Sequence, residues 1–287
     1  MANTIVLKRR IGSVKNTKQI TKAMELVSAS KMRRAQERAL KSRPYQNLAY
    51  ELLAKFSLLK EVETHPLFEK RKVKTKLYIL ISSNSTLAGA YNSNVIKMFN
   101  NAALDDAKKG IKTSVIAIGN QGAQHIRRVK GLNLVAVYPA FGDHPTEKDI
   151  KPVLNSILDS YRSKEVDKVE IIYTLYKSNL VQTASTLELL PANIESTDTK
   201  TTYSNFEPST EVVLDNVTAR LIEVQLWQSL LESLASEHSM RMLAMKNATD
   251  NASDIIDDLT LEFNTARQAS ITQELAEITG GAEALKD

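Results

Sequence analysis

The chain has 287 residues, enough to bury a hydrophobic core without disulfide staples, and the absence of cysteine excludes thiolate zinc sites and thiol redox chemistry. It contains only 9 glycines, where average usage would give about 20, so long helices are expected and a loop-rich β protein is excluded. The net charge of +5 divides unevenly: residues 1–43 hold 12 basic and 2 acidic side chains, and residues 209–287 hold 5 basic and 14 acidic ones.

The N-terminal 57 residues are expected to form one helical arm. No proline or glycine lies between Ser13 and Arg43, and apolar side chains recur there at roughly helical spacing. This stripe comprises Val14, Ile20, Met24, Val27, Met32, Ala35 and Leu40. Pro44 is expected to bend or interrupt the helix because proline lacks a backbone N–H, and a second helical stretch then continues to Phe56.

Residues 72–208 alternate between short β-branched runs and helical stretches. The expected strands are 76–82, 113–118, 134–138, 169–176 and 185–190. The expected helices are 93–109, 121–130 and 147–163. Such alternation predicts a mostly parallel, Rossmann-like α/β domain inserted between two terminal arms, with the last two strands forming an antiparallel hairpin.

Residues 209–287 are expected to form the second arm. Between Pro208 and Gly280 lie 71 residues without proline or glycine, which would span roughly 105 Å as a helix. Apolar side chains recur at steps of three and four, the spacing of a coiled-coil seam. They are Val217, Leu221, Val224, Trp227, Leu231, Leu234, Met242, Met245, Ala248, Ala252, Ile255, Leu259, Phe263 and Ala266. Gly280 and Gly281 are expected to end the helix. The opposite charges of the arms favour a long antiparallel two-helix coiled coil.

The sequence carries no signature of a catalytic, cofactor-binding or metal site. Neither a GxGxxG motif nor a lysine-containing P-loop is present, and Gly119-Asn120-Gln121-Gly122 is only a GxxG after a strand. This turn is interpreted as a strand-to-helix connection, with phosphate binding as the weaker alternative. The four histidines lack metal-type spacing. No cofactor and no metal are therefore expected.

Charge and hydropathy indicate which classes of partner the chain can bind. No stretch approaches the roughly 20 apolar residues that cross a bilayer, so a chain that is not inserted in a membrane is expected. The basic stretch Lys31–Arg43 fits either a nucleic-acid-binding helix or a helix that faces acidic protein. Nucleic acid is disfavoured because its phosphates would lie beside the acidic C-terminal arm. A protein partner is therefore expected.

Residues near both termini carry a specific resemblance to one family. Residues 7–24 read LKRRIGSVKNTKQITKAM and are followed by Ser30-Lys31-Met32. Residues 241–252 read RMLAMKNATDNA, and residues 264–275 read NTARQASITQEL, followed by Glu277 and Gly281-Ala282. These stretches resemble the two shaft helices of the gamma subunit of F-type ATP synthase, the central rotor stalk.

The middle of the chain departs from the family in one turn. The family usually carries Asp-Arg-Gly-Leu-x-Gly-Gly after the first strand, whereas this chain has Asn84-Ser85-Thr86-Leu87-Ala88-Gly89-Ala90. The charged pair of that turn is therefore absent. The cysteine-bearing insert of the chloroplast type is absent as well, which implies a bacterial-type subunit.

The resemblance implies a non-catalytic rotor subunit that couples ion-driven rotation of the membrane c ring to ATP synthesis or hydrolysis at the beta subunits. Residues 1–57 and 209–287 would be the shaft helices, and residues 72–208 would be an α/β foot domain. The implied partners are the ring of alpha and beta subunits, the epsilon subunit and the c-subunit ring. The implied location is peripheral, at the cytoplasmic face of the bacterial plasma membrane.

The resemblance also implies which residues contact those partners. Met24, Arg241, Arg267 and Gln268 would contact the beta subunits and couple shaft orientation to catalysis. Glu207 would contact the c ring, with an exposed turn before a helix as the alternative interpretation.

One function of a different class remains open from the residues. A free-standing α/β nucleotide-binding protein with coiled-coil arms would share the same element pattern. The missing phosphate loop argues against it, and tight nucleotide binding by the isolated chain would favour it.

Overall fold

The computed structural model describes residues 2–56, 65–139, 141–142, 145–179, 181–192 and 210–284. Contacts divide the chain into two compact units. The first unit comprises Met1–Ser28 and Arg241–Asp287, and the second unit comprises Ala29–Met240. Each unit therefore contains a part of both terminal helices.

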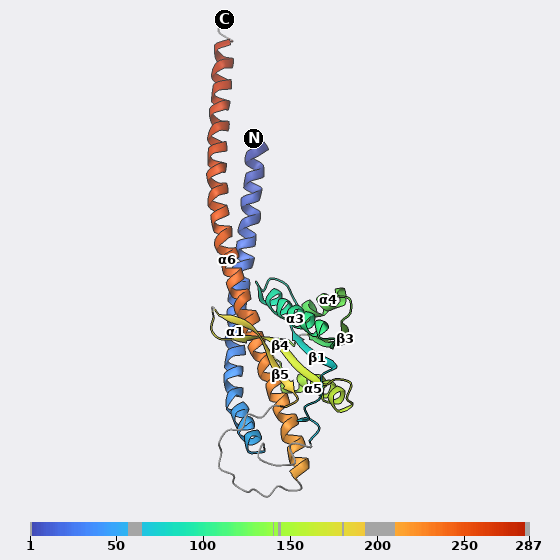
Figure 1. Cartoon of the computed structure of the whole chain (residues 1–287). Helices are drawn as coiled ribbons and strands as arrows, with labels where there is room; N and C mark the ends of the chain where they lie inside the picture. Colours follow the sequence, from blue (N-terminus) through green and yellow to red (C-terminus); the bar gives the residue numbers. More distant parts are fainter. Residues whose placement is uncertain are drawn as a thin grey trace. The chain divides into compact units, whose positions relative to one another are not determined.

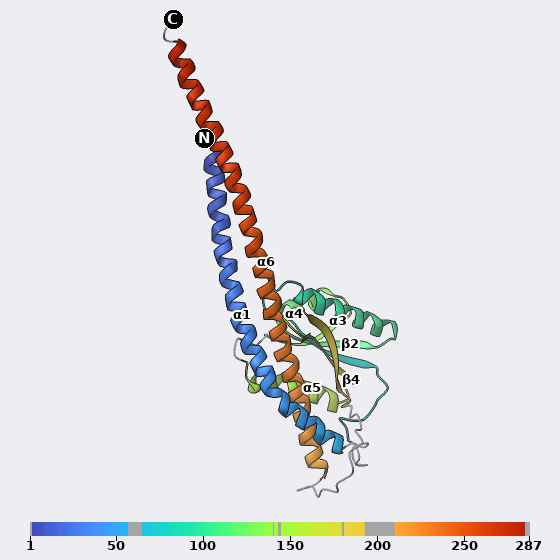
Figure 2. The same ribbon diagram turned by 90° about the vertical axis from the view of Figure 1, so that its left-hand side faces the viewer.

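The two long helices are α1 (Ala2–Phe56) and α6 (Thr210–Ala284). In the first unit their segments run side by side in opposite directions (Figure 1, Figure 2), as predicted for an antiparallel coiled coil. Pro44 does not interrupt α1, which continues to Phe56, and the prediction that Gly280 and Gly281 end α6 is wrong, because α6 continues to Ala284. Proline removes one backbone hydrogen bond and glycine weakens a helix by about 1 kcal/mol, so neither stops a helix that the surrounding residues favour.

The seam between α1 and α6 in the first unit uses small and polar side chains as well as apolar ones. Ser28, Met245 and Ala252 are buried. The Thr249 hydroxyl is likewise buried and bonds the Thr21 hydroxyl across the seam at 2.8 Å. Ser28 and Ala252 add little side-chain bulk to the seam, and the hydroxyl pair fixes the register of the two helices.

The predicted apolar stripe is wrong at four positions. Ile20, Val27 and Leu40 of α1 and Ile255 of α6 are about half exposed or more. Small residues near these positions, such as Ser28, Ala39 and Ala252, are buried instead. Close helix packing depends on the shape of the side chains as well as on their hydrophobicity.

The second unit contains a five-stranded sheet in the order β3-β2-β1-β4-β5. Its elements are β1 (Thr75–Ile81), α3 (Tyr91–Lys108), β2 (Lys112–Ile118), α4 (Asn120–Arg128), β3 (Asn133–Tyr138), α5 (Glu147–Arg162), β4 (Lys168–Tyr176) and β5 (Gln182–Leu190). The pairs β1·β2, β1·β4 and β2·β3 are parallel, and β4·β5 is an antiparallel hairpin. The predicted mostly parallel α/β architecture is therefore confirmed.

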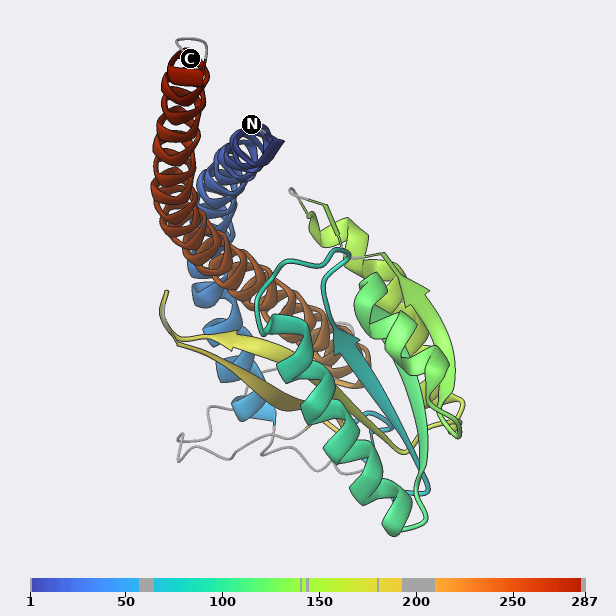
Figure 3. The ribbon, with the colours of Figure 1, turned by 90° about the horizontal axis from the view of Figure 1, so that it is seen from above.

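Helices cover both faces of this sheet. On one face, α3 and α4 pack over a core that includes Tyr78, Leu80 and Phe99. On the other face, α5 and α6 pack over a core that includes Ile79 and Ile157 (Figure 3). The strands β1, β2 and β4 are buried on both sides, which accounts for their nearly continuous apolar runs, whereas the edge strand β3 is only partly buried.

In the second unit α6 carries a second buried face that the predicted stripe did not include. Ile222, Leu226 and Leu230 are almost fully buried and join the core between the sheet and α5. Their spacing of four residues was visible in the sequence as another helical stripe. The helix is therefore an integral part of the α/β domain core.

A buried charged cluster ties α3 to β1. The Tyr78 hydroxyl donates to Asp106 at 2.5 Å, and the Lys76 ammonium lies 3.1 Å from the same carboxylate. Lys76 also approaches Glu170 of β4 at 3.5 Å. Burial and the bond to Asp106 raise the pKa of Tyr78 well above its ordinary value. The hydroxyl therefore stays protonated and remains a donor.

Among the described residues, none of the helices has the length and apolar character that a membrane span requires.

Candidate functional site

Ligands of doubly wound α/β sheets bind outside the carboxyl ends of the strands, where the strand order reverses. In this sheet the order reverses between β1 and β4. Helix α6 occupies that position in the second unit. The Ser233 and Tyr91 hydroxyls lie 2.7 Å apart, and Ser233 also accepts the Thr174 N–H at 3.4 Å. All three residues are buried, so the chain's own helix fills the crevice where a nucleotide would bind.

The GxxG turn approaches its neighbouring strand too closely to hold a ligand. The N–H of Gly122 donates to the Ser82 hydroxyl at 2.9 Å. The N–H groups of the two preceding residues, Asn120 and Gln121, donate to Asn84 Oδ1 and to the Ser83 carbonyl. These are the donors that a phosphate would need. The interpretation of this turn as a strand-to-helix connection is therefore favoured over phosphate binding.

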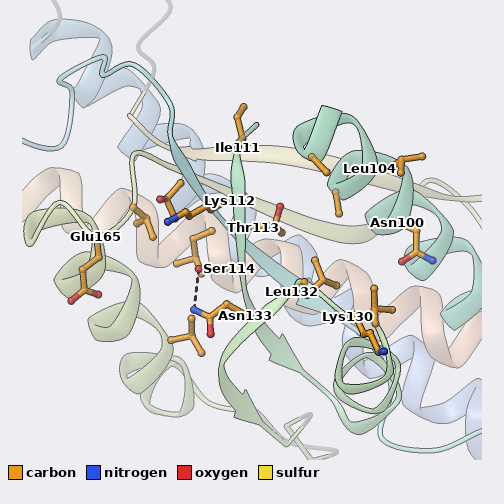
Figure 4. Close-up of a pocket in the computed structure, with 18 of the residues that line it drawn as sticks. Asn100, Leu104, Ile111, Lys112, Thr113, Ser114, Lys130, Leu132, Asn133 and Glu165 are labelled. Carbon is orange, nitrogen blue, oxygen red and sulfur yellow. Dashed lines mark hydrogen bonds between the residues drawn. The ribbon is translucent and has the colours of Figure 1, made fainter. Parts of the chain in front are cut away.

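A cavity of about 1020 Å³ lies at the other end of the strands, by the amino ends of β1, β2 and β3 (Figure 4). Its wall includes the Asn133 side chain, which donates to the Ser114 hydroxyl at 3.3 Å. Lys130, in the connection after α4, and Glu165, in the connection after α5, lie on opposite sides of the view, so they do not form an acid–base pair. Within the described parts of the chain, no group of three or more metal-type side chains is assembled.

The residues that the resemblance singled out lie on the long helices. Arg267 and Gln268 are exposed neighbours on α6. In the first unit Met24 of α1 is half-buried and Arg241 of α6 is buried. Glu207 lies outside the described residues. The structure therefore leaves Arg267 and Gln268 accessible, whereas Arg241 is packed into the chain.

The Thr21–Thr249 contact gives the register between Met24 and Arg241. Three residues along α1 from this contact, Met24 lies level with Lys246. Arg241 lies five residues further along α6, about 7.5 Å on the helix axis. The two side chains therefore occupy neighbouring but different levels of the helix pair.

Sequence reasoning missed an apolar stripe near the end of α6. Ile271, Leu275 and Ile278 are 49%, 58% and 68% exposed. Their spacing of four and three residues places them on one side of the helix. A contiguous row of exposed large apolar side chains marks an interaction surface more often than a solvated one. The spacing was the signal available in the sequence.

A groove of about 720 Å³ lies along the helix pair of the first unit. Three lysines of α1 line it on one side, Lys15, Lys18 and Lys22, and Asp250 of α6 lies among the lining residues on the other. The groove presents positive charge from α1 beside the acidic α6. An acidic protein segment is the partner that such a surface attracts.

Comparison with known proteins gives consistent results along the whole chain. The family model described as ATP synthase matches residues 3–285. The chain is 43% identical to the ATP synthase gamma chain of Herpetosiphon aurantiacus over 295 residues, covering 99% of each chain. It is 38% identical to the ATP synthase gamma chain of Desulfitobacterium hafniense over 286 residues, covering 100% of each.

Solved structures share the fold at lower identity. A chain from the rotational state 3 structure of the Euglena gracilis mitochondrial ATP synthase matches with a TM-score of 0.70 at 15% identity, covering 99% of this chain and 95% of that one. A chain from the central stalk and c-ring structure of the Tetrahymena thermophila mitochondrial ATP synthase matches with a TM-score of 0.61 at 22% identity, covering 80% and 99%. At these identities the likeness concerns the fold alone.

Proposed function

The chain belongs to the gamma chain family of ATP synthases, and from this premise we propose how its residues serve as the rotor of the complex. It is the gamma subunit, the central stalk, and its partners are the alpha and beta subunits, the epsilon subunit and the c ring. The prediction drawn from the terminal motifs is thereby confirmed over the alternative of a free-standing nucleotide-binding protein. The filled crevice at Ser233 agrees with that outcome.

The exposed stripe of Ile271, Leu275 and Ile278 is the observation that best supports a rotor role. An apolar surface on a helix end can turn inside a ring of subunits without breaking directional bonds, because hydrophobic contact is non-directional. The polar pair Arg267 and Gln268 lies just before the stripe and supplies the directional contacts. The end of α6 therefore offers non-directional apolar contacts at Ile271, Leu275 and Ile278 and directional hydrogen bonds at Arg267 and Gln268.

The chain performs no bond chemistry in this proposal. Each beta subunit meets a different side of the asymmetric shaft in succession, and shaft orientation acts as the ligand that selects its open or closed state. Residues 1–57 and 209–287 form the shaft, and residues 72–208 form the foot on the c ring, with Glu207 at the contact. The complex lies at the cytoplasmic face of a bacterial plasma membrane, to which this subunit is peripheral.

Assembly and nucleotide binding test this function. The full chain is expected to purify together with alpha, beta, epsilon and c subunits when the complex is extracted from membranes. The isolated chain is expected to bind no nucleotide tightly in equilibrium dialysis. Stoichiometric, tight ATP binding by the isolated chain, or its absence from the purified complex, would contradict the rotor role.

Arg267 and Gln268 are proposed as the contacts with a beta-subunit loop. A guanidinium offers several donors, and a carboxamide offers both a donor and an acceptor. Bonds that form in only one orientation could each favour one catalytic state by about 1.5 to 3 kcal/mol, which shifts a population roughly tenfold or more. Met24 and Arg241 are proposed to lie near an acidic collar of the beta subunits, where an added lysine would create a further ion pair.

Substitution of these residues is expected to change turnover and coupling. In reconstituted complexes Arg267→Ala and Gln268→Ala should each lower steady-state ATP hydrolysis by about tenfold, because one orientation-specific bond is lost. Met24→Lys should lower ATP-driven proton pumping relative to hydrolysis. Gln273→Ala is the matched control, since the Gln273 amide is exposed and donates to Glu277 of its own helix at 2.9 Å. Normal turnover and coupling in all three assembled variants would refute this assignment of residues.

A further inference from the structure

Three buried serines repeat at every third residue of α6 in the second unit. Ser233, Ser236 and Ser239, named here the serine ladder, are at most 1% exposed. Residues three apart lie close together on a helix, so the three hydroxyls follow one another along one side. Buried hydroxyl groups require hydrogen-bond partners, and each of these hydroxyls finds one outside its own helix.

The first two serines replace a missing strand neighbour of β4. The last residue of β4 that pairs with β1 is Ile172, so Thr174 lies beyond the end of that ladder. Its backbone N–H donates to the Ser233 hydroxyl at 3.4 Å, and its carbonyl accepts the Ser236 hydroxyl at 3.2 Å. Helix α6 therefore continues the hydrogen bonding of the sheet where β1 ends.

The third serine holds the connection between β4 and β5. The Ser239 hydroxyl donates to the Asn179 carbonyl at 2.9 Å and accepts the Gln182 amide at 3.1 Å. The same hairpin also reaches α1, because Gln36 bonds the Tyr176 hydroxyl and, at 3.3 Å, Asn179 Oδ1. The β4–β5 hairpin is therefore hydrogen-bonded to α1 through Gln36 and to α6 through Ser239.

Apolar packing and hydrogen bonds between α6 and the sheet resist different motions of the helix. The core of Ile222, Leu226 and Leu230 resists separation of α6 from the sheet but is non-directional. Bonds to backbone groups weaken steeply when distance or angle changes, so they resist sliding and twisting. The serine ladder supplies such bonds to two consecutive points of the β4–β5 hairpin.

Resting on the proposed rotor function, we propose that the serine ladder is the torsionally stiff joint between the α/β foot domain and the shaft. Its serines position α6 against the sheet and touch no nucleotide. Ion flow turns the foot domain, and the hydrogen bonds of the serine ladder make α6 rotate with that domain and not twist against it. Stiffness matters when the shaft works against a load and matters little when it turns freely.

The test compares loaded and unloaded work in the full reconstituted complex. The variant with Ser233→Ala, Ser236→Ala and Ser239→Ala should keep unloaded ATP hydrolysis within twofold of the natural chain. Gradient-driven ATP synthesis should fall at least threefold. The Thr174 amide should exchange its hydrogen at least tenfold faster. Ser253→Ala is the matched control, because the Ser253 hydroxyl bonds the Thr249 carbonyl of its own helix at 3.0 Å.

A milder variant protects the test against misfolding. Ser239→Ala alone leaves both bonds to Thr174 in place and should lower synthesis less than the triple variant, with the same unloaded hydrolysis. If the triple variant makes ATP at the natural rate although its Thr174 amide exchanges hydrogen faster, the proposal that the serine ladder is a stiff joint is wrong. Equal losses of hydrolysis and synthesis would also overturn it, because they indicate a general folding defect. If the natural chain itself supports neither activity in the complex, the rotor function fails instead.

Discussion

Gly119→Ala is expected to lower the free energy of unfolding by about 3 to 5 kcal/mol. Gly119 has φ +98°, a conformation that alanine rarely adopts. A Cβ atom there would lie 2.1 Å from the backbone carbonyl oxygen of Ser82, which cannot move without disturbing β1. Urea denaturation of the isolated chain, followed by circular dichroism, measures the loss.

Gly131→Ala separates the clash from the backbone conformation. Gly131 also has a positive φ, +89°, but a Cβ atom there would meet nothing within 4 Å. Its alanine variant should therefore lose only about 1 to 2 kcal/mol. Equal losses at the two positions would show that the close approach of Gly119 to Ser82 is unimportant.

Asp106→Ala is expected to lower the free energy of unfolding by about 3 kcal/mol, because it removes one partner of a buried ionic cluster. Lys76 would lose its 3.1 Å contact, and the Tyr78 hydroxyl would lose its acceptor. Glu170 would remain near Lys76 at 3.5 Å and limit the cost. Thermal and urea denaturation of the isolated chain both report this change.

The preceding residue offers the control for this substitution. Asp105 is mostly exposed and pairs with Lys108 on its own helix at 3.2 Å. Asp105→Ala should leave stability nearly unchanged, since exposed pairs of this kind contribute little. Similar losses from both substitutions would mean that the cluster around Asp106 does not stabilise the sheet.

The α/β domain could be predicted closely because its signals are local. The strand expected at 113–118 is Lys112–Ile118, and the helix expected at 147–163 is Glu147–Arg162. Each run has the periodicity of its element, and the surrounding fold agrees with that preference. The effect of Pro44 and Gly280 on the long helices was harder to predict, because such residues weaken a helix without deciding where it ends.

The inner face of α6 could be predicted only in part. Ile222 and Leu226 form a visible stripe, but Ser233 and Ser236 resemble surface residues in composition. Their burial depends on Thr174, which lies about sixty residues earlier in the chain and pairs with β5 but has no strand neighbour on its β1 side. Such tertiary compensation leaves no local pattern.

The candidate contacts of the shaft depended on the resemblance. Arg267 and Gln268 are exposed polar residues on a helix, and nothing in their spacing distinguishes them from a solvated face. The apolar stripe from Ile271 to Ile278 is different, because its spacing of four and three residues is visible in the sequence although it was not predicted. Apolar contacts leave a periodic trace in a sequence, whereas single polar contacts do not.

The exposed end of α6 has a consequence for how the cell handles this chain before assembly. Leu261, Leu275 and Ile278 are each more than half exposed. Surfaces of this kind promote aggregation and attract chaperones and proteases. We therefore expect a surplus of the free subunit to be removed unless its partners are synthesised alongside it, so that the supply of those partners sets how much of the chain persists.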